Sequence, residues 1–268
     1  MDFFDILKLI VTKIFFTKAS IDDIRTTEIR DIEVYFFISL LVILNLIQIF
    51  YYKDFNILYS LLINLAIFGF FGFFLYFSGQ WGLGDSFLLL SLGLLNIFKN
   101  IFEILNWLLI TFSVGVFFIF FYSVLFVFLL KKYEKLNLFS KISLFISLFF
   151  SFLSLYFLFN KMTFNFLISF LILLYVSIPF LKSVKDLMIK RISINKLKEG
   201  DVLLDFKVWR GITKKEIEEL KRKKIKYVYI KEGVRYAPTF LFTLILIVLE
   251  KIFGIVIFDF FPKDFFLI

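Results

Sequence analysis

Long apolar runs constrain this chain more than any other feature of its sequence. About eight of them can be distinguished, at residues 3 to 19, 33 to 52, 57 to 78, 85 to 98, 102 to 130, 142 to 160, 163 to 182 and 237 to 260. A helix of about 20 apolar residues crosses the hydrocarbon layer of a bilayer. Because 61% of the 268 residues are hydrophobic, the chain cannot bury its apolar side chains in one water-soluble globule. The sequence predicts an all-α polytopic membrane protein with about six to eight transmembrane helices.

Three of these runs depart from a regular span. The first carries Asp5, Lys8 and Lys13, the fourth is short, and the last is interrupted by Glu250 and Lys251. The N-terminus has neither the basic stretch nor the small-residue cleavage site of a signal peptide, so we expect it to remain as a helix.

Basic residues gather in alternate connections between the apolar runs, and this asymmetry predicts the orientation. Lysine and arginine are retained on the cytoplasmic side of a membrane. Besides a long basic segment after residue 182, the basic connections hold Lys18, Arg25, Arg30, Lys131, Lys132, Lys135 and Lys141. We therefore predict a multi-pass protein of the cell membrane whose N-terminus points outward and whose first and third connections face the cytoplasm.

Residues 183 to 236 differ from the rest of the chain and carry most of its net charge of +9. Alternating apolar residues predict a strand over Asp201 to Trp209 and another over Lys226 to Lys231. Thr213 and Glu216 form a capping-box pattern that opens a helix through Lys224. We expect three parts: a membrane-embedded catalytic helical domain at 1–182, a small basic cytoplasmic α+β domain at 183–236, and a C-terminal membrane helix or re-entrant segment at 237–268. The basic charge fits a solvated face beside anionic lipid headgroups or a substrate-binding surface equally well, and no recognised motif points to nucleic acid.

The residue types that are absent narrow the chemistry. The chain has no cysteine and no histidine, which excludes thiolate nucleophiles, imidazole bases, disulfides and the usual transition-metal ligands. A Ser-Lys dyad would need a lysine deep in the bundle near a serine such as Ser86. We therefore predict carboxylate or hydroxyl chemistry without a metal or another cofactor.

The tetrapeptide Gly82-Leu83-Gly84-Asp85 places a carboxyl at the mouth of an apolar run, and an acid within a membrane segment is a candidate functional residue. Because Gly82 and Gly84 lack side chains, a substrate backbone or a neighbouring helix can approach Asp85 closely. Taken alone, the tetrapeptide is more often a helix N-terminus with a capping aspartate than a catalytic site.

A second acidic cluster, residues 22 to 31, lies between the first two apolar runs. Asp22 and Asp23 are about 100° apart if helical, so only one of them can face the bundle interior. Taken alone, this cluster is an ordinary solvated connection. Two carboxyls that meet at one membrane face suggest an aspartyl protease, in which one ionised acid takes a proton from water and one protonated acid polarises the scissile carbonyl.

Together these stretches resemble the GxGD aspartyl peptidases that process type IV prepilins, most closely the archaeal prepilin and preflagellin peptidases. The first motif of that family has an aspartate eight residues before its last acid, a spacing that Asp23 and Asp31 match and Asp22 does not. The second motif corresponds to Gly79 through Asp85. Residues 197 to 203 and 230 to 240 are similar to the small domain and the following helix of the archaeal members, so the resemblance covers nearly the whole chain.

The resemblance implies that Asp23 and Asp85 are catalytic and that the chain removes a short basic leader from type IV pilin-like or archaellin precursors at the cytoplasmic membrane face. Glu28 and Asp31 are candidates for binding the basic leader, although a solvated face explains them equally well. Arg30 stands where proline is common in the family, and Phe87 stands where many members carry lysine. The cysteine-rich zinc-binding insertion of the bacterial relatives is absent, so we expect peptidase activity without N-methylation.

Three other functions compete with this one. The chain could be an inactive pilin-assembly protein that binds such helices without cutting them, with Arg30 and Phe87 as signs of drift. It could be a polytopic transporter or channel that uses acids within its spans, but the candidate acids cluster at one face. A presenilin-like protease, which cuts inside a substrate helix, pairs GxGD with a Tyr-Asp dipeptide that this sequence lacks.

Overall fold

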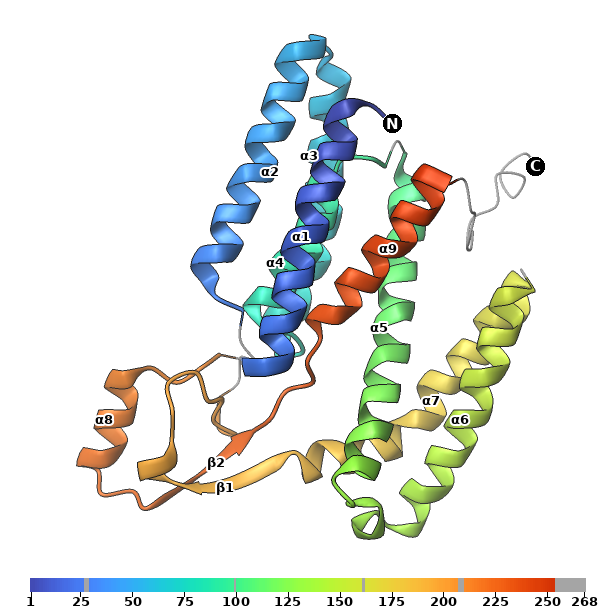
Figure 1. Ribbon diagram of the computed structural model, residues 1–268. Coiled ribbons are helices and arrows are strands. Elements are labelled where there is room, and N and C mark those ends of the chain that lie inside the picture. The colour runs from blue at the N-terminus through green and yellow to red at the C-terminus, as the bar shows by residue number, and fades with distance from the viewer. Residues whose placement is uncertain (27–28, 99, 161, 207–209, 254–268) are drawn as a thin grey trace.

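The computed structural model describes residues 1–26, 29–98, 100–160, 162–206 and 210–253, and these residues form mostly helices with one small sheet (Figure 1). In chain order the helices and strands are α1 (Phe3–Thr26), α2 (Asp31–Tyr52), α3 (Phe55–Phe77), α4 (Leu83–Leu94), α5 (Ile101–Leu129), α6 (Leu138–Phe159), α7 (Thr163–Leu187), β1 (Ile189–Ser193), α8 (Lys214–Arg222), β2 (Tyr227–Lys231) and α9 (Ala237–Phe253).

Five of the described helices are long and apolar enough to cross a membrane: α2, α3, α5, α6 and α7. The prediction of a mostly helical, multi-pass membrane protein is confirmed at this level. Every apolar run corresponds to a helix over its described residues, and residues 254–268 of the last predicted segment lie outside them. Helices α1, α4 and α9 are the three that fall short of a regular span. The described part of α9 has 17 residues and α4 has only 12.

Of the charges that weaken the hydropathy of α1, Lys8 points inward, whereas Lys13 and Lys18 are exposed. Lys8 is fully buried, and its ammonium group donates to Asn45 Oδ1 at 3.2 Å and to Gln48 Oε1 at 3.0 Å, both on α2. The same ammonium lies 3.3 Å from a carboxylate oxygen of Asp5. A charge inside a membrane bundle needs such partners, and this cluster joins the first turns of α1 to the last turns of α2.

Close backbone approach joins α4 to α3. A Cβ on Gly72 would lie 2.9 Å from the backbone oxygen of Ser86, whose hydroxyl donates to the Gly72 carbonyl at 2.8 Å. Gly72 therefore marks a close approach of the two helix backbones. The start of α4, which carries the GLGD motif, is held firmly against its neighbour.

Helices α6 and α7 pack against each other along a row of buried serines, and α7 also packs against α5 (Figure 1). The hydroxyl groups of Ser140 and Ser183 are 2.6 Å apart, and Ser154 donates to Ser169 at 2.9 Å. Small polar side chains let helix backbones approach and bond within a bilayer.

One end of the bundle gathers the connections that the sequence analysis identified as basic. Helices α1, α5 and α7 end there, α2, α4 and α9 begin there, and the sheet and α8 cover this end (Figure 1). The arrangement brings the two acidic motifs to the same end of the molecule as residues 189–231.

Within the described residues, the small sheet has two strands. β1 and β2 are antiparallel, with Ile189 opposite Lys231 and Ser193 opposite Tyr227. Beneath them lies a separate apolar cluster of Ile194, Leu197, Ile212 and Ile217. The predicted strand over Lys226 to Lys231 is confirmed as β2, and the predicted helix after Thr213 is confirmed as α8.

The predicted strand over Asp201 to Trp209 is wrong. Only Leu203 forms an isolated bridge, to Ile230, and the chain then turns so that the Phe206 amide donates to the Leu203 carbonyl at 3.2 Å. The last three residues of that prediction, 207–209, lie outside the described residues. Along one edge, β2 pairs with β1, which follows α7 directly. The predicted strand would have paired along the opposite edge of β2, where Leu203 forms its bridge.

The cap of α8 provides a first testable feature. Thr213 Oγ1 accepts from the Glu216 amide at 3.4 Å, and the Glu216 carboxylate accepts from the Thr213 amide at 2.9 Å. The neighbouring Arg210 guanidinium and the Thr213 amide together lower the pKa of Glu216 to about 2. This carboxylate therefore stays charged, and keeps its cap, until the pH falls well below 4.

We expect Thr213→Ala to destabilise α8 by about 0.5–2 kcal/mol, because one backbone amide loses its acceptor. The measurement is the rate of tryptic cleavage within 214–224 of the full chain at neutral pH, which should rise. Thr213→Ser keeps the acceptor and should digest like the native chain. Equal digestion of both variants would show that the cap contributes nothing.

Candidate active site

Asp23 lies near the end of α1, beyond the apolar run, because the helix continues through Thr26. Its exposed fraction is 8%. Asp22, one position earlier, points outward, where its carboxylate lies 3.2 Å from the ammonium of Lys18. Of the two adjacent acids, only Asp23 thus faces the bundle, as the helical spacing requires.

The buried Asp23 carboxylate is bonded to the start of α9. Its Oδ2 accepts a hydrogen bond from the Ala237 amide at 2.9 Å. The first amides of a helix have no partner within the helix and carry partial positive charge, so they stabilise a carboxylate. This bond joins residues 214 positions apart in sequence and fixes α1 against α9.

Asp85 is the third residue of α4, whose N-cap is Gly82. One of its oxygens accepts from the Gly82 amide at 3.2 Å, so Asp85 helps to cap the helix from its third position and is not itself the N-cap residue. This hydrogen bond leaves the carboxyl accessible, because Asp85 also lines a pocket with Asp23.

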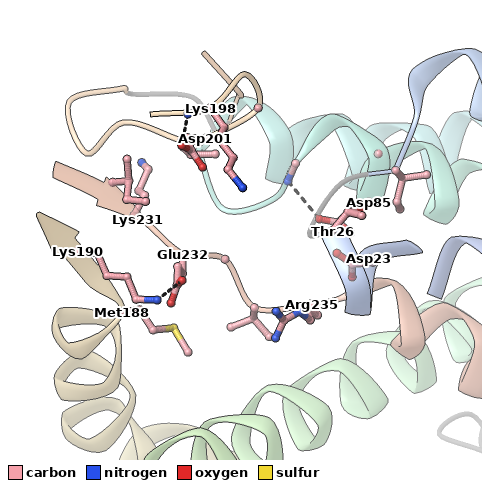
Figure 2. A pocket seen from close by; sticks show the side chains of 18 of the residues that line it. Asp23, Thr26, Asp85, Met188, Lys190, Lys198, Asp201, Lys231, Glu232 and Arg235 are labelled. Carbon is pink, nitrogen blue, oxygen red and sulfur yellow. Dashed lines mark hydrogen bonds and ion pairs between the residues drawn. The ribbon is translucent and has the colours of Figure 1, made fainter. Parts of the chain in front are cut away.

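The pocket has a volume of about 560 Å³ and contains both aspartates. The charge of Asp23 acts on Asp85. In Figure 2 the two side chains lie near each other in the lining of the pocket. The structure therefore brings these two acids together in one pocket, as the sequence predicted.

The two motif glycines also line this pocket. A Cβ placed on Gly84 would meet nothing closer than the Ile29 side chain, at 3.6 Å. The missing side chain at this position therefore leaves room in the pocket rather than relieving a clash.

The other candidate residues fall elsewhere. Asp31 is exposed at the first position of α2 and does not line the pocket, and Glu28 lies outside the described residues. The two departures from the family pattern are also placed: Arg30 is the exposed N-cap residue of α2, and Phe87 packs edge-on against Tyr35 and Phe73. An aromatic cluster therefore occupies the position where many family members carry a lysine.

Sequence reasoning missed the segment that connects β2 to α9. Arg235 lines the pocket beside the aspartates, and its Nη1 donates to the Tyr122 hydroxyl at 3.0 Å. Tyr236 is buried against Trp81 and Phe240, with ring centres 5.0 and 5.5 Å away. The only signal for these residues was their place in a stretch similar to the archaeal peptidases.

Tyr236 keeps its proton at neutral pH. Burial, followed by the nearby negative charge of Asp85, raises the pKa of the phenol above its usual value. Its side chain lies directly over the bare backbone of Gly115 on α5, so the segment is anchored to a helix that also lines the pocket, through Tyr122 and Phe126.

The far wall of the pocket belongs to the small sheet and its loops. It carries charges of both signs, from Lys190, Lys198, Glu199, Asp201, Lys231 and Glu232 (Figure 2). Lys190 and Glu232 form an ion pair. Desolvation lowers the pKa of Lys231, and the positive charge of Lys185 adds to this.

Within the described ranges, no group of three or more acidic side chains is arranged to hold a metal ion. The chemistry that this arrangement can perform with its own groups is acid–base catalysis by two carboxyls. Comparison of the chain with family models, with curated proteins and with solved structures found no significant match.

Proposed function

We propose that this chain is an aspartic endopeptidase of the GxGD prepilin peptidase type, which removes the short basic leader from pilin-like or archaellin precursors. The observation that carries the proposal is the meeting of Asp23 and Asp85, from separate motifs, in one pocket. Neither motif alone distinguishes a catalytic acid from a helix cap or a solvated connection, whereas their convergence favours paired-carboxyl chemistry.

The proposed reaction is the addition of water to the peptide carbonyl. One carboxylate takes a proton from water while the oxygen bonds to the carbonyl carbon, and the protonated partner gives its proton to the carbonyl oxygen. Collapse of the resulting diol breaks the C–N bond: the departing nitrogen takes a proton from the carboxyl that received one, and a diol hydroxyl returns a proton to the other carboxylate. Like charges held close together, away from bulk water, favour one shared proton.

We further propose that α1 to α7 and α9 all lie in the membrane, with the sheet and α8 in the cytoplasm. The basic connections near Lys18, Lys132 and Lys141 support this orientation, because all belong to the sheet-bearing end of the bundle and lysine is retained inside. A precursor whose basic leader remains in the cytoplasm would then meet the two aspartates from the correct side.

Purified protein in detergent, mixed with a tagged precursor, tests the proposal. We expect the precursor to shorten, and mass spectrometry should place the cut just ahead of its hydrophobic helix. A cut well inside that helix would favour a presenilin-like protease. Binding of the precursor without shortening would favour an inactive assembly protein, and solute flux in proteoliposomes without shortening would favour a transporter.

A further inference from the structure

The segment from Glu232 to Tyr236 is held on both sides of Arg235. Val234 packs against the apolar cluster of Phe120, Val127 and Phe180, and the next helix begins at Ala237, whose amide binds Asp23. These contacts leave the backbone of Arg235 little freedom, so its side chain has a defined place in the pocket.

The guanidinium of Arg235 is incompletely bonded. Nη1 donates to Tyr122 at 3.0 Å, whereas Nε is buried and has no hydrogen-bond partner among the described residues. Burying a donor without a partner is costly, and such exceptions call for an explanation. In Figure 2 Asp23 lies between Asp85 and Arg235, and the positive charge of Arg235 acts on Asp23.

The two aspartates therefore have unequal surroundings. Asp23 accepts an amide from another helix and lines the same pocket as Arg235, whose positive charge acts on it. Among the described residues, Asp85 accepts the Gly82 amide of its own helix, and the charge that acts on it is that of Asp23. In the part of the chain that the structure describes, the phenol of Tyr236 lies near Asp85, and that of Tyr122 lines the same pocket.

We propose that Arg235 is a positioning residue that holds Asp23 as the ionised member of the pair, so that Asp23 takes the proton from water and Asp85 carries the proton given to the substrate. This inference rests on the proposed peptidase function and deepens it. An opposite charge stabilises a carboxylate. The guanidinium of Arg235 supplies that charge to Asp23 and not to Asp85. The shared proton therefore resides on Asp85.

The test is the pH dependence of leader cleavage by the full chain in detergent, with Arg235→Gln, Arg235→Lys and Lys196→Gln. Removing the charge of Arg235 makes Asp23 easier to protonate, so the acid limb of the rate profile should move to higher pH by up to about one unit. On that limb the rate should fall by up to about tenfold, and the alkaline limb should stay in place. Arg235→Lys should restore the native acid limb.

Lys196 is the matched control, because it is an exposed cation of the same region outside the pocket. Its replacement should leave the acid limb unmoved. A profile of Arg235→Gln that is only lower, with both limbs in their native places, would overturn the inference and leave a purely structural role. An equal shift from Lys196→Gln would also overturn it. Absence of cleavage by the native chain would instead refute the proposed function.

Discussion

Asp85→Asn and Asp23→Asn are each expected to lower the rate of leader cleavage by a factor of about 10²–10⁴, the usual contribution of a positioned acid or base. Asparagine is nearly the same shape as aspartate, but its side-chain amide neither gives up nor takes a proton near neutral pH. Its amide oxygen can still accept the backbone amide of Gly82 or of Ala237, so both variants should fold. The measurement is the single-turnover rate with purified protein and a tagged precursor.

Asp22→Asn is the matched control for these variants, because Asp22 is adjacent in sequence but lies on the outer face of α1. It should cleave at the native rate. The double variant of Asp23 and Asp85 should lose little more activity than either single variant, because residues that act as one unit are not additive. Leader release by either single variant at the native rate would refute the mechanism.

Gly115→Ala is expected to have the largest effect on stability. A Cβ at this position would overlap the Tyr236 hydroxyl oxygen, so the phenol would have to move. Overpacking of this kind costs about 1–3 kcal/mol, which thermal denaturation in detergent should detect. Displacing Tyr236 would also disturb Arg235 and the Ala237 amide, so leader cleavage should fall as well.

Two further variants isolate the cause. Tyr236→Phe removes the oxygen that clashes, so the double variant Gly115→Ala/Tyr236→Phe should recover part of the lost stability. Gly84→Ala introduces the same methyl group at a place where the nearest atom is 3.6 Å away, and its stability should stay close to native. If Gly115→Ala melts like the native chain, the close contact between α5 and Tyr236 does not contribute to stability.

Hydropathy predicted the helices well because burial in lipid requires long apolar helices, but it placed their charged ends poorly. The first run was expected to end at residue 19, whereas α1 continues through Thr26. Lys18, Asp22 and Arg25 lower the local hydropathy there without interrupting the backbone hydrogen bonds. Asp23 therefore lies on a helix rather than in a loop, which fixes the direction of its side chain.

The strand prediction over Asp201 to Trp209 failed for a different reason. Alternating apolar residues describe a pattern of burial, and Leu203 and Phe206 do pack against the small apolar cluster. They reach it from a turn instead of a paired strand. β1 had no alternating pattern to reveal it, since Lys190 and Arg191 are adjacent and exposed.

The site was predictable only where motifs exist. Asp23 and Asp85 belong to patterns with defined spacing, and the choice of Asp23 over Asp22 agrees with the burial of its side chain. Arg235 and the Ala237 amide reach the pocket through a tertiary contact spanning most of the chain, and no local pattern encodes such a contact. Their roles follow from distance and bonding alone.

The two carboxyls stand where α4 begins and where α1 is about to end, not halfway along either helix. In a peptidase built this way, the depth of the substrate helix in the membrane selects the bond that is cut. A precursor whose hydrophobic helix lies at the same depth as α1 and α4 would present the bond just outside that helix to the two carboxyls, whatever the leader sequence. Lengthening the apolar stretch of the precursor by one residue should then move the scission point by one residue.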